Sequence, residues 1–221
     1  MCMADDFGFP GRLTESAWEQ MALDTLGELG WRYIPGAEIA PGSGERTSWD
    51  DLLIPSRLRA AIVNLNPKLP AGAVDDAVAL VATAGSTDAI AENRTVHEYL
   101  TEGLRKISYT DDTGVEVTPT IRLVSVEPDD NDWFVANQVT VIRSDYERRF
   151  DLVLYMNGMP VAVVELKNAG SQYASLTDAH AQLQTYLREF PLAFRYAVMA
   201  LVSDGITASY GTPFTPFEHF S

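Results

Sequence analysis

The chain has 221 residues, with 31 Asp and Glu against 16 Lys and Arg, which gives a formal net charge of −15. Proteins that bind nucleic acid on their own are usually basic, so we expect this chain alone to bind DNA weakly. It has no apolar run of about 18 residues and no basic-then-apolar leader, which predicts a cytoplasmic protein outside the membrane. The single cysteine, Cys2, excludes an internal disulfide, and the three histidines do not stand at zinc-ligand spacing.

The first half of the chain is expected to be mostly helical. Ser16 and Glu19 have the spacing of a capping box at the start of a first helix, and Gly30 follows where that helix should end. A short extended piece, "WRYIPG", and a loop over 35–48 come next. Apolar residues recur at helical spacing over 15–29, 50–66, 71–83 and 86–104.

After residue 104 the apolar period changes to two, which predicts strands, including "VEVTPTIRLVSVE" and "WFVANQVTVIR". The strongest strand pattern is "FDLVLYMNGMPVAVVELK", two apolar runs joined by the favoured turn pair Asn157-Gly158. A helix over 175–189 and a further strand pair follow. We therefore expect an α/β (α+β) fold with a central mixed sheet flanked by helices. After a lead-in over 1–13, one domain would span 14–221, with a helical part over 14–104 and a sheet core over 105–210.

Glu165 and Lys167 end the most apolar strand of the chain, and their separation of two places both side chains on one face. Charges at such a position are costly unless they are paired, and a cross-strand salt bridge is one explanation. Asp151, at the start of the preceding strand, offers a second carboxylate. Two adjacent carboxylates favour a cation between them, and Mg²⁺ suits carboxylates, waters and phosphate oxygens. With a lysine beside the attacking water, this set predicts metal-dependent phosphodiester hydrolysis.

The turn raises a geometric difficulty for a shared ion. A regular two-residue hairpin at Asn157-Gly158 would set Phe150 opposite Glu165, so Asp151 would point to the other face of the sheet. A shared ion requires a one-residue shift from a bulge near 157–159, or a bend at Asp151. We expect one of these, with Gly158 or its neighbour at positive φ.

The hairpin resembles the PD-(D/E)xK nuclease core, with Phe150-Asp151 in place of Pro-Asp and "ELK" at 165–167. Other segments extend this resemblance. In this order, they are similar to the N-terminal nuclease domain of type I restriction enzyme R subunits, over about residues 14–210. The segments are "NRTVHEYLTEGL" (93–104), "NDWFVANQVTVIR" (131–143), "RRFDLVLYMNGMPVAVVELKN" (148–168) and "AHAQLQTYL" (179–187).

The resemblance implies a restriction-endonuclease-like core that cuts double-stranded DNA with Mg²⁺, after an ATP-driven motor has pulled the DNA through a complex. The partners would be methyltransferase and specificity subunits. No G-x-x-x-x-G-K-[ST] phosphate loop occurs in the 221 residues, so we expect ATP to bind outside this chain. Two alternatives remain open: a stand-alone PD-(D/E)xK repair or resolvase-type nuclease, and a non-catalytic docking module of the restriction complex.

The resemblance also assigns roles to residues. Asp151 and Glu165 would bind metal, Lys167 would be the catalytic lysine, and the backbone carbonyl of Leu166 would add a metal ligand. Glu19 would supply another acidic ligand, with Glu15 as its rival and the capping box as the plain alternative.

Two further groups of residues are expected near the site. Gln182 and Tyr186, four apart on one helical face, resemble the accessory Gln-x3-Tyr motif of the family. Arg148 and Arg149, with Arg143, are candidates for phosphate contacts, or form an ordinary solvated cluster.

Overall fold

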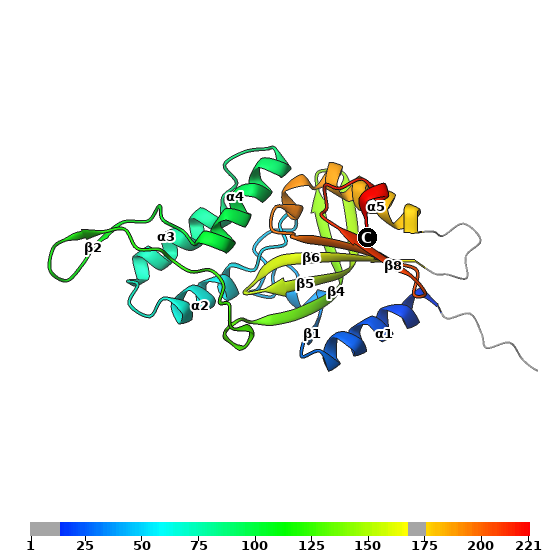
Figure 1. Cartoon of the computed structure of the whole chain (residues 1–221), viewed down its shortest axis with the longest axis horizontal. Helices are drawn as coiled ribbons and strands as arrows, with labels where there is room; N and C mark the ends of the chain where they lie inside the picture. Colours follow the sequence, from blue (N-terminus) through cyan, green and yellow to red (C-terminus); the bar gives the residue numbers. More distant parts are fainter. Residues whose placement is uncertain (1–13, 168–175) are drawn as a thin grey trace, which may run out of the picture.

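The computed structural model describes residues 14–167 and 176–221, so the expected lead-in over 1–13 lies outside the described residues. A six-stranded mixed sheet has the order β1-β4-β5-β6-β7-β8. Helix α1 covers one face and α5 the other, while α2–α4 stand at one end (Figure 1). The helices are α1 Glu15–Glu28, α2 Pro55–Leu65, α3 Ala71–Ala82, α4 Ala89–Glu102 and α5 Leu176–Glu189. The strands are β1 Arg32–Pro35, β2 Tyr109–Thr110, β3 Glu116–Val117, β4 Trp133–Arg143, β5 Tyr146–Met156, β6 Met159–Leu166, β7 Met199–Ser203 and β8 Ala208–Gly211.

Two helix starts differ from expectation. The cap of α1 is Thr14, whose side chain accepts a hydrogen bond from the Ala17 amide, so the capping box from Ser16 to Glu19 is wrong. This leaves the Glu19 side chain available for contacts with the sheet. Helix α2 begins at Pro55, later than the expected 50, because proline has its φ preset for a first helical turn and no N–H to donate. No helix in the described ranges is long and apolar enough to cross a membrane.

The sheet also reaches outside the expected sheet core over 105–210. The extended piece expected at "WRYIPG" is confirmed as strand β1, which pairs in parallel with β4 as an edge strand, although it lies within the expected helical part over 14–104. The expected strand over 115–127 is mostly wrong, since only the two-residue β3 and a bridge from Ile121 to Leu104 form there. Pro119 cannot donate to a ladder, which limits pairing in this segment. The small β2–β3 hairpin extends beyond α2–α4 (Figure 1).

Both faces of the sheet are buried, which explains why all eight residues of β6 are buried. One core cluster lies between the sheet and α5, a second lies between the sheet and α1, and a third joins α2–α4 to the turn end of the β5–β6 hairpin. Representative members are Phe150, Val153 and Leu183 in the first, Leu23, Leu154 and Val164 in the second, and Leu58, Val74 and Met159 in the third.

The β5–β6 hairpin contains the expected one-residue shift, but not where it was expected. Asn157 and Gly158 form a two-residue turn with φ of 54° and 79°, as a tight hairpin requires. The pairing shifts farther along, because Val161 is an extra residue between the pairs Tyr155–Pro160 and Leu154–Ala162. The shift is thus confirmed, and its placement near 157–159 is wrong. With this shift the last pair of the ladder is Leu152–Val164, so that Asp151 and Glu165 are the next residues on the two strands.

The turn is closely packed at Gly158. A Cβ on Gly158 would lie 2.4 Å from the Ile54 carbonyl oxygen, just before α2. The turn end of the hairpin is therefore packed against α2, and Asp151 and Glu165 lie at the opposite end.

Candidate functional site

Two carboxylates from neighbouring strands meet at the far end of the hairpin. Asp151 Oδ2 accepts a hydrogen bond of 2.8 Å from the Leu166 amide, which brings the backbone after Glu165 beside it. Glu165 Oε1 accepts one of 2.9 Å from Lys167 Nζ. The Glu165 side chain is only 1% exposed, and its Oε2 has no hydrogen-bond partner. The structure therefore brings together Asp151, Glu165, Leu166 and Lys167.

The electrostatics of the pair are unfavourable for two negative charges. Burial, followed by the nearby negative charge of Asp151, raises the pKa of Glu165 to about 8, while the ion pair and hydrogen bond with Lys167 act in the opposite direction. Burial also raises the pKa of Asp151, although the Leu166 amide and the Lys167 charge act in the opposite direction. The two carboxylates are thus hard to ionise together unless a cation lies beside them.

The side chains present fit a hard divalent cation. Such an ion would give the unpartnered Glu165 Oε2 a binding partner. It would also lower the raised pKa values of both carboxylates. Within residues 14–167 and 176–221, no three His, Cys, Asp or Glu side chains group closely enough to hold a metal. Two carboxylates alone leave most positions of an Mg²⁺ to waters and substrate phosphate oxygens, as is usual for this ion.

Glu19 reaches the same region from α1. Its Oε1 accepts a 2.7 Å hydrogen bond from Asn137 Nδ2, and its Oε2 accepts one from Gln138 Nε2. The charges of Glu15 and Glu19 both raise the pKa of Asp151. Whether Glu19 binds metal stays a prediction, but it belongs to the surroundings of Asp151 and does not cap its helix.

Gln182 and Tyr186 lie on α5, where the Tyr186 ring contacts Phe150 edge-on at 5.2 Å between centroids. Gln182 Nε2 donates a hydrogen bond to the Tyr186 hydroxyl. Burial, followed by the negative charge of Glu165, raises the pKa of Tyr186 to about 12. The phenol is therefore a neutral group close to Glu165, and its accessory role stays a prediction.

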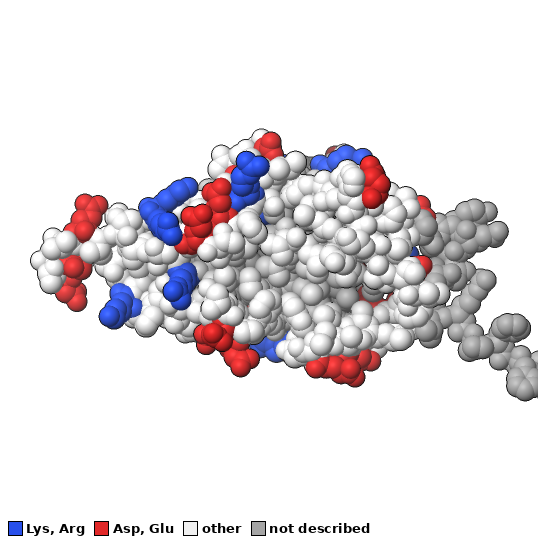
Figure 2. Space-filling view, viewed as in Figure 1, with Lys and Arg blue, Asp and Glu red and all other residues white. Residues whose placement is uncertain are grey.

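The arginine cluster is only partly available to a ligand. Arg148 forms an ion pair with Glu189, with its Nε 2.8 Å from Oε2, and Arg143 lies 3.5 Å from the Glu189 carbonyl oxygen. Arg149 is exposed. On the face in Figure 2, basic and acidic atoms are interspersed, in keeping with the weak DNA binding expected for this chain.

Sequence reasoning missed two residues near the site. The segment "VANQVTV" contains adjacent polar residues, Asn137 and Gln138, inside a buried strand, and this break in alternation was the available signal.

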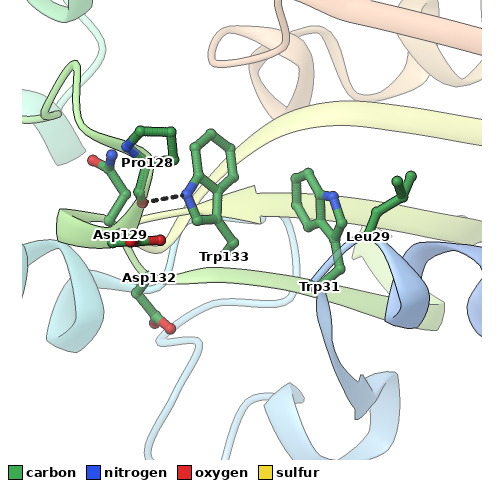
Figure 3. A pocket seen from close by; sticks show the side chains of 8 residues that line it. Leu29, Trp31, Pro128, Asp129, Asp132 and Trp133 are labelled. Carbon is green, nitrogen blue, oxygen red and sulfur yellow. Dashed lines mark hydrogen bonds between the residues drawn. The ribbon is translucent and has the colours of Figure 1, made fainter.

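A cavity of about 550 Å³ lies at the start of β4 (Figure 3). Its walls include Trp31 and Trp133, whose rings meet nearly edge-on at 5.1 Å between centroids. Trp133 pairs with Met156 next to the hairpin turn, which places this cavity at the end of the sheet opposite the site.

The sequence matches a family model described as "Type I restriction enzyme R protein N terminus" over residues 12–219. The chain belongs to this family. The type I restriction enzyme HindI endonuclease subunit of Haemophilus influenzae is 34% identical over 213 residues, 95% of this chain and 20% of the relative. A sequence from Methanocaldococcus jannaschii is 31% identical over 207 residues, 91% of this chain and 20% of the relative. The chain thus spans about a fifth of the length of these relatives.

Proposed function

We propose that this chain is the DNA endonuclease domain of a type I restriction R subunit, and that it hydrolyses phosphodiester bonds with Mg²⁺ at Asp151, Glu165 and Lys167. The observation that carries the proposal is the buried carboxylate pair beside a lysine, with one Glu165 oxygen unpartnered. The names of the relatives as endonuclease subunits support it. In the full-length protein, cleavage would be coupled to ATP-driven DNA movement, within a complex with methyltransferase and specificity subunits.

Each residue has a chemical role in this proposal. Asp151 and Glu165 would hold Mg²⁺ together with the Leu166 carbonyl. A bound Mg²⁺ supplies charge neutralisation at the scissile phosphate and a lower pKa for bound water. Lys167 Nζ, which is fixed by Glu165 at the edge of the site, can donate hydrogen bonds to the attacking water or to a phosphate oxygen. The neutral Tyr186 hydroxyl beside Glu165 can donate to a water in the site.

The test uses the complete R subunit with its partner subunits. Asp151→Ala, Glu165→Ala and Lys167→Ala should each abolish DNA cleavage and leave ATP hydrolysis unchanged, because the two reactions use separate sites. Arg59→Ala, which removes an exposed ion pair with Asp75, is the control and should change neither activity. Normal cleavage by Lys167→Ala would contradict the proposal, and unchanged cleavage by all three variants would favour a docking module.

A further inference from the structure

Strand β4 breaks its alternation beside the candidate site. Ala136 and Val139 both lie in the core cluster that faces α5, although they are three residues apart and one face of a regular strand repeats every two. Between them, Gln138 has a φ of 50°. This left-handed conformation costs about 1 kcal/mol or more for a residue other than glycine, and such strain concentrates at functional sites.

The break coincides with the catalytic candidate on the next strand. The pairs Asn137–Leu152 and Val139–Phe150 flank it, so Gln138 lies opposite Asp151. Strand β5 shows the same three-residue spacing, since Phe150 and Val153 also share the α5-facing cluster. Both strands are therefore irregular at the level of Asp151.

The irregularity lets two adjacent side chains reach one carboxylate. In a regular strand Asn137 and Gln138 would point to opposite faces. Here their amide nitrogens donate to the two oxygens of Glu19, with 2.7 Å between Asn137 Nδ2 and Oε1. A half-buried glutamate on α1, which would otherwise sample several rotamers, is thus held by both of its oxygens.

The orientation of the Asn137 amide is itself fixed. Its Oδ1 lies 2.9 Å from the Tyr33 hydroxyl and 3.4 Å from the Gly36 amide, which both donate to it. Gly36 can approach this closely only without a side chain, since a Cβ there would lie 2.1 Å from the Asn137 carbonyl oxygen. With the oxygen end occupied, the NH2 end of the Asn137 amide is directed at Glu19.

We propose that Asn137 and Gln138 are positioning residues that hold the Glu19 carboxylate on the Asp151 side of the site, so that its negative charge adds to the attraction for a cation held by Asp151 and Glu165. This inference rests on the proposed function. Each Glu19 oxygen accepts one amide hydrogen bond and retains further lone-pair capacity for water or an ion.

The test measures the Kd of the 221-residue chain for Mn²⁺. The electron paramagnetic resonance signal of free Mn²⁺ reports how much of the ion is unbound. Gln138→Gly removes the amide and keeps a residue that adopts positive φ without strain. It should raise the Kd for Mn²⁺ about tenfold, as expected for a partner that orients a ligand. The control is Gln20→Ala, which removes an amide-to-carboxylate hydrogen bond to Asp24 on the same helix and should leave the Kd unchanged.

A second background separates positioning of Glu19 from a general structural effect. In the Glu19→Ala variant, Gln138→Gly should cause no further loss of affinity, because the two residues act through one interaction. An unchanged Kd for Gln138→Gly, or an equal loss in the Glu19→Ala background, would overturn the inference. Wild-type Mn²⁺ affinity in both Asp151→Ala and Glu165→Ala would instead refute the cation site itself.

Discussion

The two ends of the β5–β6 hairpin bury polar side chains in opposite ways. At the turn, Asn157 is 0% exposed, and its side chain is fully used. It donates to the Leu123 carbonyl and to Asn131 Oδ1, both at 2.9 Å, and accepts from the Asp132 amide at 2.8 Å. At the other end, Glu165 is equally buried, yet one of its oxygens has no partner and its pKa is raised to about 8.

The difference distinguishes a structural polar residue from one arranged for chemistry. A buried polar group with all its hydrogen bonds stabilises one conformation, whereas an unsatisfied one destabilises the fold until something binds to it. Asn157 fastens the turn to the segments beside it. The unpartnered oxygen of Glu165 lowers the stability of the fold, and our proposal that Glu165 binds a cation would account for this pattern.

The largest loss of stability should follow from removing the fully hydrogen-bonded side chain of Asn157. Asn157→Gly keeps a residue suited to positive φ but leaves the Leu123 carbonyl and the Asp132 amide without their side-chain partner. We expect a loss of about 3 kcal/mol in the free energy of unfolding, measured with urea. Mn²⁺ affinity should remain that of the wild type, and a weakened affinity would show that the two ends are coupled.

Removing the charge of Glu165, at the other end of the hairpin, should instead increase the free energy of unfolding. The folded pKa of Glu165, about 8, lies above the usual 4.5, so the stability of the metal-free protein falls as pH rises between these values. Glu165→Gln removes this dependence and should be more stable than the wild type by about 2–4 kcal/mol at about pH 9. Thermal or urea unfolding with a chelator, across this pH window, checks it. Parallel pH profiles for the two proteins would contradict the assignment.

The smallest expected effect tests how much the charge of Asp151 contributes to the raised pKa of Glu165. Asp151→Asn removes the neighbouring negative charge while burial of Glu165 persists, so the pKa of Glu165 should fall by about one pH unit. Carbon-13 NMR titration of the glutamate carboxyls would measure it. A pKa that stays at the wild-type value would mean that Asp151 and Glu165 do not share a site.

The sequence predicted which charged side chains the fold brings together better than it predicted the path of the strands that carry them. Asp151, Glu165 and Lys167 stand out because charges end an apolar strand, and the need for a one-residue shift follows from strand parity. The position of the shift at Val161 could not be read, because bulges depend on what packs against each strand. The hydrogen-bond partners of Glu19 could not be predicted either. Ser16 and Glu19 fit a capping box locally, and only the folded chain brings Asn137 and Gln138 to the Glu19 carboxylate.

The hydrogen bonds of the site join residues that are separated by very different lengths of chain, which bears on the order in which the site forms during folding. The hydrogen bond from Leu166 to Asp151 closes a segment of 15 residues, whereas that from Asn137 to Glu19 spans 118. Loop-closure entropy makes the longer closure about 2 kcal/mol more expensive. We therefore expect the hairpin to bring Asp151 and Glu165 together early in folding, and α1 to add its negative charge after β1 has paired with β4. On this order of events, the electrostatic field of the site would be completed late in folding.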